Sequence, residues 1–142
     1  MAEDNSLILA PMVGLMLWTL GMYIWMYATR IPAIMNLPKE KADEAMTPGK
    51  LEEHLPAKVQ WKAHNYNHLH EQPTLFYAVC LLLAVIGQGD GVNIWLAWAY
   101  VALRIVHSIF QATINTTPRF VIFLIASACM YALVIRAALA VF

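Results

Sequence analysis

The stretch KAHNYNHLHEQPTLFYAVCLLLAV, residues 62–85, determines how the chain is organised, because a polar segment runs directly into an apolar one. Residues 64–71 hold three histidines, two asparagines and a glutamate, whereas the 13 residues Thr74–Ile86 carry no charge. Thirteen residues are too few to cross a hydrocarbon core of about 30 Å as a helix. The segment reaches membrane length only if its polar half, back to about Lys58, belongs to the same span.

The whole chain has the composition of a membrane protein. Hydrophobic residues make up 61% of its 142 residues and charged residues only 13%, and the zero net charge gives no reason to expect a nucleic-acid partner. Leu7–Ala28 is a run of 22 residues without a charge, too long for the core of a cleaved signal peptide. We predict an all-α integral membrane protein, a four-transmembrane-helix bundle forming a single domain over residues 1–142. The expected spans are about residues 7–28, 58–86, 93–115 and 120–142, with a polar connection at 30–57 that carries a short surface helix.

Lysine and arginine residues predict the orientation of these spans. Six of the nine lie in residues 30–62, whereas the N-terminal tail and the glycine-rich turn Gly87–Asn93 contain none. We therefore expect the first and third connections to be cytoplasmic and both termini to lie on the other side of the membrane. Arg136, near the far end of the fourth span, is an exception that either extends outward to the interface or faces an inward partner.

Two polar stripes with the same helical spacing mark the second and third spans. The first stripe consists of His64, Asn67, His68 and Glu71, at positions i, i+3, i+4 and i+7. The second consists of Arg104, His107, Ser108 and Gln111, extended by Tyr100 and Asn115. Because charged groups in a membrane face the bundle interior or water, we expect the two stripes to face each other around a pocket open to the cytoplasmic side. Asn65 and His70 fall off the first stripe.

Three other features bear on this pocket. Pro73 should bend the second span and leave the carbonyl of Leu69 without its helical donor, which is tolerable beside a polar cavity. The spacing of His64, His68 and Glu71 would also suit a metal, but five histidines are too few for a histidine-rich membrane oxidase, and we expect no metal. A purely structural Glu71–Arg104 ion pair is the main alternative to a binding pocket. Both cysteines lie in apolar runs, as buried small hydrophobic residues do.

With these residues, nearly the whole chain resembles the MAPEG family, the membrane-associated proteins of eicosanoid and glutathione metabolism. The run NHLHEQPTLF is similar to the family's Asn/Glu motif followed by Pro and Phe on helix two. The run RIVHSIFQATINTTPR is similar to its Arg-x-x-His/Tyr pattern on helix three and to the arginine that enters helix four. The matching positions are Asn67, Glu71, Pro73 and Phe76 in the first run, Arg104, His107 and Arg119 in the second, and Arg30 in YATRIP.

The resemblance implies a homotrimer that uses glutathione as co-substrate toward apolar electrophiles or lipid peroxides, with membrane lipid around it. Arg119 would be the catalytic residue that stabilises the glutathione thiolate. The expected glutathione-binding residues are Arg30, Lys62, His64, Asn67, His68, Glu71, Tyr100, Arg104, His107 and Gln111. Two positions depart from the active members, which have an arginine where this chain offers Lys62 or His64 and a tyrosine where it has Gln111.

The competing prediction is a non-catalytic trimeric membrane scaffold, or a lipid- or small-molecule-binding protein of the same fold. That class uses the two stripes as structural contacts. From the compact chain and the lack of retention signals we expect the bacterial inner membrane as the location.

Overall fold

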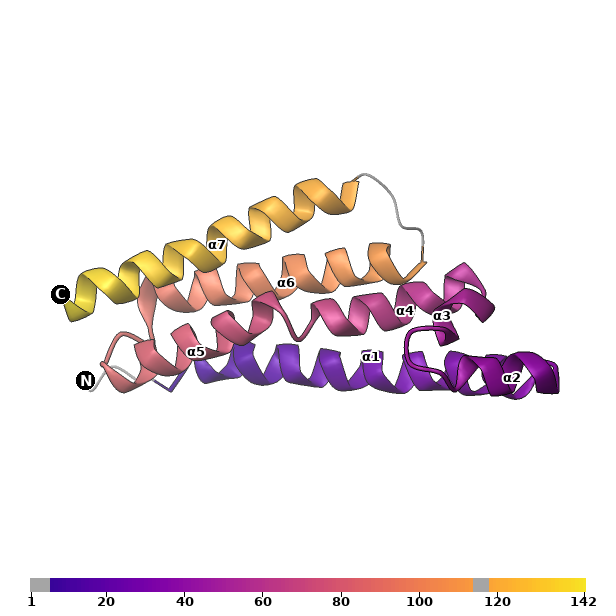
Figure 1. Ribbon diagram of the computed structural model, residues 1–142. Coiled ribbons are helices and arrows are strands. Elements are labelled where there is room, and N and C mark those ends of the chain that lie inside the picture. Colours follow the sequence, from indigo (N-terminus) through magenta and orange to yellow (C-terminus); the bar gives the residue numbers. More distant parts are fainter. Residues whose placement is uncertain (1–5, 114–117) are drawn as a thin grey trace.

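The long apolar runs of the sequence form long helices. The computed structural model describes residues 6–113 and 118–142, so the predicted Asn115 and the acidic start of the N-terminal tail lie outside the described residues. Within these ranges the helices are α1 (Leu9–Met35), α2 (Lys39–Ala45), α3 (Leu51–His54), α4 (Ala57–His68), α5 (Gln72–Val85), α6 (Gly91–Thr113) and α7 (Pro118–Val141). α1, α6 and α7 run alongside the joined pair α4–α5, and α1 begins at the end of the bundle where α7 ends (Figure 1). The predicted all-helical class is confirmed.

Among the described residues, three helices are long and apolar enough to cross a membrane, namely α1, α6 and α7. The predicted span at 58–86 is instead divided into α4, of 12 residues, and α5, of 14 residues. Pro73 lies in the first turn of α5, where a missing N–H group leaves no intrahelical bond unmade. Pro73 therefore begins a helix rather than bending one, contrary to the prediction from sequence.

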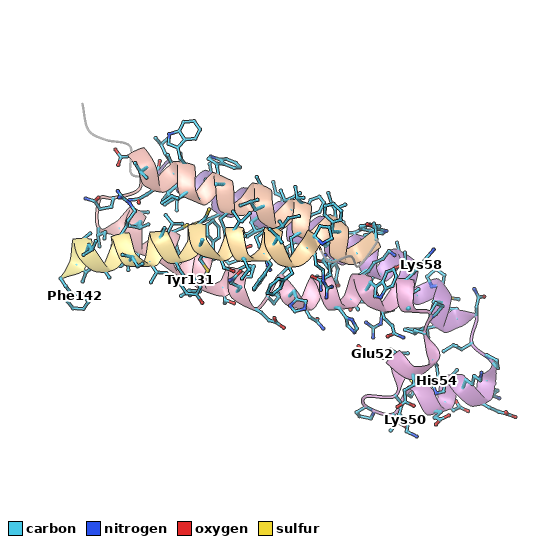
Figure 2. All side chains as sticks on the ribbon, turned by 90° about the horizontal axis from the view of Figure 1, so that it is seen from above. Lys50, Glu52, His54, Lys58, Tyr131 and Phe142 are labelled. Atoms are coloured by element: carbon cyan, nitrogen blue, oxygen red, sulfur yellow. The ribbon has the colours of Figure 1, made fainter. Side chains whose placement is uncertain are left out.

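The polar connection carries its own short helices, as predicted. α1 continues past the expected boundary at Ala28 to Met35 and includes Pro32. α2 and α3 follow, and Glu44 of α2 forms an ion pair with Lys50 at 3.0 Å. Figure 2 shows Lys50, Glu52 and His54 gathered at one end of the molecule, with Phe142 at the opposite end. One end of the bundle is therefore strongly polar.

The core of the bundle is apolar, and so is much of its outer surface. Fully buried side chains include Leu15 of α1, Phe76 and Leu83 of α5, and Tyr100 of α6, whose ring stacks on Phe76 at 4.4 Å. Large apolar side chains also cover the outside, including Trp95, which is 75% exposed. Such a surface suits lipid rather than water. Of the two free cysteines, Cys80 is buried as predicted and Cys129 is half-buried.

Candidate functional site

Arg104 connects α6 to the point where α4 ends. The arginine is only 2% exposed, and its Nη2 donates a hydrogen bond of 2.9 Å to the carbonyl oxygen of His68. Because α4 ends at His68, this carbonyl lacks its i+4 helical donor and accepts instead a long bond of 3.4 Å from the backbone N–H of Glu71. The carbonyl of Leu69, which the sequence predicts to lack its helical donor, accepts no backbone hydrogen bond from the described residues. Arg104 therefore stabilises the break between α4 and α5.

A second buried contact joins three helices at Ser108. Asn65 of α4 donates a hydrogen bond of 2.6 Å to the Ser108 hydroxyl, and Trp18 of α1 donates one of 3.0 Å to the same oxygen. Asn65 is 1% exposed and Ser108 is fully buried. The sequence spacing had placed Asn65 away from the facing stripe. The face of α4 that meets α6 thus carries Asn65. The predicted facing of the first stripe is wrong for His64, Asn67 and Glu71, whereas His68 does share a cavity with residues of the second stripe.

The residues of the first stripe lie instead at the surface of the chain. Asn67, His68 and Glu71 are exposed, and the His68 ring and the Glu71 carboxylate approach to 2.8 Å. His64 is half-buried and lies 3.4 Å from the carboxylate of Glu52 on α3. The break after His68 takes Glu71 out of the helical register that the spacing assumed. Within residues 6–113 and 118–142, Glu71 and Arg104 do not form the ion pair considered as an alternative.

The second stripe does face the interior of the bundle. Its described members, all buried, are Tyr100, Arg104, His107, Ser108 and Gln111. The Tyr100 hydroxyl and Arg104 Nε are buried without a hydrogen-bond partner among the described residues. Two unpaired polar atoms in a buried stripe are unusual, because such groups are normally satisfied.

Part of this stripe opens into a cavity of about 250 Å³, hereafter the site cavity. Its lining residues are His68 of α4, His107 and Gln111 of α6, and Arg119, Phe120 and Phe123 of α7. The His107 and Phe123 rings lie 5.8 Å apart, and Arg119 is half-buried. The cavity therefore combines one guanidinium group, two imidazoles and an amide with an aromatic wall. Such a set can hold an anionic group beside an apolar molecule.

A larger cavity of about 460 Å³ lies on another side of α4 and contains two more of the predicted binding residues. Arg30 of α1 and Asn67 of α4 line it, together with Leu51 of α3. Lys62 lies near α1, with its ammonium 5.1 Å from the centre of the Trp25 ring. The predicted site residues are thus divided. Arg30 and Asn67 share one cavity, and His68, His107, Gln111 and Arg119 share the other. Lys62, His64, Glu71, Tyr100 and Arg104 line neither.

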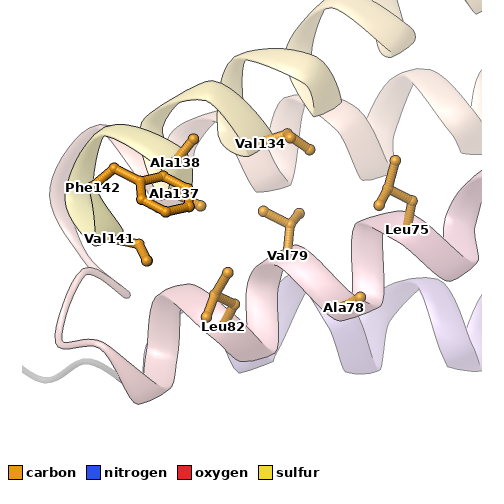
Figure 3. A pocket seen from close by; sticks show the side chains of 9 residues that line it. All are labelled: Leu75, Ala78, Val79, Leu82, Val134, Ala137, Ala138, Val141 and Phe142. Atoms are coloured by element: carbon orange, nitrogen blue, oxygen red, sulfur yellow. The ribbon is translucent and has the colours of Figure 1, made fainter.

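A third cavity, of about 330 Å³, is apolar throughout and lies between α5 and α7 (Figure 3). Val79 and Leu82 of α5 face Val134 and Ala138 of α7 across it, and Phe142 closes one end. None of the predicted site residues reaches this cavity. In the described parts of the chain, no group of three or more His, Cys, Asp or Glu side chains could hold a metal ion.

Comparison with known proteins adds one finding to this geometry. A family model described as MAPEG family matches residues 8–139, which is nearly the whole chain. No curated protein and no solved structure matches the chain.

Proposed function

The chain belongs to the MAPEG family, and on that premise we propose that it is a glutathione-dependent membrane transferase or peroxidase. Its second substrate would be an apolar electrophile or a lipid peroxide. The observation that carries the proposal is the site cavity, where Arg119, His107 and Gln111 meet an aromatic wall next to apolar, lipid-suited surface. Glutathione offers a thiol and charged groups, and the bilayer offers the apolar substrate.

Arg119 has the catalytic role in this proposal. A free thiol has a pKa of about 8.5 and reacts as the thiolate, so a neighbouring cation is needed to favour ionisation near neutral pH. Among the described residues that line the site cavity, Arg119 is the only cationic side chain that stays charged at all working pH values. With an aryl halide, the thiolate sulfur attacks the ring carbon, the halide leaves, and the thiol proton passes to water.

The other cavity residues would bind and orient the substrates. His68, His107 and Gln111 can exchange hydrogen bonds with the peptide groups and carboxylates of glutathione. Phe120 and Phe123 form the apolar wall against which an electrophile would pack. Gln111 supplies an amide where active relatives have a tyrosine, so this chain would use a weaker donor at that position.

We further propose that the protein is a homotrimer and that a neighbouring subunit completes the site. Asn67, His68 and Glu71 are exposed beside an apolar outer surface, and polar groups left facing lipid are costly. A second subunit packed against this side of α4 would cover them. It would also bring Arg30 or Lys62 of one subunit toward the site cavity of the other. In this arrangement α4 and α5 together form a fourth membrane crossing.

A non-catalytic scaffold or binding protein is the second candidate, and one observation favours it. Arg104 and Ser108 have structural partners, His68, Asn65 and Trp18, that need no ligand. Part of the polar stripe is therefore accounted for by helix packing alone. This candidate predicts that glutathione has no effect on the stability of the purified protein.

Conjugation of glutathione to a chromogenic aryl halide tests the enzyme proposal. Arg119→Ala should lower kcat/KM about a hundred-fold, the usual effect of removing one group that stabilises developing negative charge, and Arg119→Lys should retain part of the rate. Lys41→Ala is a matched control, because it removes an exposed cation on α2, outside the site cavity. A folded protein with no glutathione-dependent rate, or an Arg119→Ala variant as active as the wild type, would contradict the proposal.

A further inference from the structure

Arg136 on α7 is held in one orientation by a buried asparagine. Its Nε donates a hydrogen bond to the side-chain oxygen of Asn93, near the start of α6. Asn93 is 2% exposed, and its own amide nitrogen donates a bond of 2.7 Å to the carbonyl of Gln88. Both polar atoms of the Asn93 side chain are thus hydrogen-bonded. Because Asn93 is held in place, its bond to Nε fixes the direction of the Arg136 guanidinium group.

The outer edge of this guanidinium group is open. Neither Nη nitrogen of Arg136 has a hydrogen-bond partner among the described residues, and the same holds for the side-chain amide of Gln88. Both residues line a cavity of about 320 Å³ together with Leu139 and Ala140. A pair of parallel guanidinium N–H groups matches two oxygens of a phosphate. Within residues 6–113 and 118–142, no acidic side chain lines the cavity to compete.

The position of the cavity along the bundle agrees with the headgroup layer of a membrane. Arg136 lies five residues before the last residue of α7, about 8 Å from the helix end at 1.5 Å per residue. On α6, Asn93 comes two residues before Trp95, which is 75% exposed. Exposed tryptophans gather where the hydrocarbon core meets the headgroups. Asn93 and Arg136 therefore lie at the depth of lipid phosphates.

We propose that the cavity of Gln88, Arg136, Leu139 and Ala140 binds the phosphate group of a membrane phospholipid. The arginine and glutamine bind the phosphate oxygens, and the exposed Leu139 contacts the start of an acyl chain. This site is at the end of the bundle opposite α2 and α3, so it does not depend on the proposed enzyme activity. The same chemistry would fit a free phosphate ion, but the position of the cavity at the headgroup layer favours the lipid.

Native mass spectrometry of the full-length protein in detergent provides the test. Phosphatidylglycerol is titrated against diacylglycerol with the same acyl chains, which lacks the phosphoglycerol headgroup. The wild type should bind phosphatidylglycerol about ten-fold more tightly than diacylglycerol, and Arg136→Gln should remove the difference. Arg136→Lys should bind phosphatidylglycerol several-fold more weakly than the wild type, because lysine keeps the charge but lacks the paired N–H groups of the guanidinium. Lys58→Gln, a loss of one exposed cation in α4, serves as the charge-matched control.

Asn93→Ala keeps the charge of Arg136 but removes the hydrogen bonds that orient Arg136 and hold the backbone of Gln88, and we expect it to weaken phosphatidylglycerol binding about three-fold. Thermal unfolding gives a second readout if Arg136→Gln folds poorly. Phosphatidylglycerol should raise the Tm of the wild type more than that of Asn93→Ala. Equal preference for phosphatidylglycerol in wild type and Arg136→Gln would overturn the proposal and leave Arg136 as a tie between α6 and α7. Displacement of the lipid by millimolar inorganic phosphate would overturn the lipid assignment in favour of a free phosphate site.

Discussion

The buried contact at Ser108 leads to a prediction that separates two residues only two positions apart. Asn65→Ala removes the 2.6 Å hydrogen bond from α4 to the Ser108 hydroxyl and leaves the bond from Trp18 in place. Asn67→Ala removes an exposed side chain that has no hydrogen-bond partner among the described residues. The two variants make the same chemical change on opposite sides of α4.

The expected cost of Asn65→Ala follows from the single bond that it removes. Hydrogen bonds between membrane helices contribute about 0.6 kcal/mol on average and up to about 1.7 kcal/mol. A fully buried bond of this length should lie in the upper half of that range, so we expect a loss of about 1 to 1.5 kcal/mol. Ser108→Ala should cost more, about 2 to 4 kcal/mol, because it leaves the donors of Asn65 and Trp18 both unpaired.

Unfolding by a denaturing detergent, followed by tryptophan fluorescence, measures these differences. The protein is kept free of glutathione, so that a ligand does not contribute to the stability of either variant. The predicted order of destabilisation is Ser108→Ala, then Asn65→Ala, then Asn67→Ala. If Asn67→Ala cost about 1 kcal/mol or more while Asn65→Ala stayed within about 0.3 kcal/mol of the wild type, the face of α4 described above would be refuted.

Three further predictions concern the rest of the chain. Lys50 holds the pKa of Glu44 below its ordinary value, first by a hydrogen bond and then by its charge, so Lys50→Gln should raise that pKa in an NMR titration. The stabilisation from the ion pair is present above the ordinary pKa of glutamate and is lost as the pH falls through the lowered pKa of Glu44. Pro73→Ala should lower the free energy of unfolding in detergent by about 0.4 to 1 kcal/mol, because a first-turn proline restricts the unfolded chain. Replacing a proline inside a helix would instead raise the free energy of unfolding. Phe76→Ala, at a fully buried ring, should cost about 3 kcal/mol by the same measurement, and Leu81→Ala, at a half-exposed side chain of the same helix, should cost well under half as much.

The membrane helices could be predicted from the sequence because each depends on a local property. An uncharged run of more than 20 residues gives α1, and an apolar run interrupted by a single charge, Arg136, gives α7. The exposed Trp95 and the buried Arg104 lie on different faces of α6, as the pattern of that segment predicts. The inward direction of Arg104, His107 and Gln111 follows from the same pattern. Predicting these features from the sequence requires no knowledge of the neighbouring helix.

The contact face of α4 could not be predicted in the same way. The segment is polar on several sides, so its spacing does not show which side meets α6, and Asn65 proved to be the buried residue rather than Asn67. At the break at residues 69–71, Arg104 donates a hydrogen bond to the carbonyl of His68, a contact between residues 36 positions apart. Contacts of this kind are set by tertiary packing.

The site could be predicted in part for the same reason. Arg119, His107 and Gln111 come together because α7 turns back against α6 a few residues after Gln111. Arg30 and Asn67 were expected in the same pocket but lie in a separate cavity, since α1 packs directly on α4 whereas α7 packs mainly on α6. Within one chain the two sets of residues therefore lie in different cavities.

Calorimetric titration of the detergent-purified protein with glutathione tests the central claim most directly. The account predicts saturable binding to the wild type and to Lys41→Ala, and binding at least ten-fold weaker to Arg119→Ala, whose cavity lacks the cation that favours the thiolate. Thermal unfolding of each variant would confirm that it is folded. No binding by the folded wild type at millimolar glutathione, or equal binding by Arg119→Ala, would contradict the assignment of the site cavity.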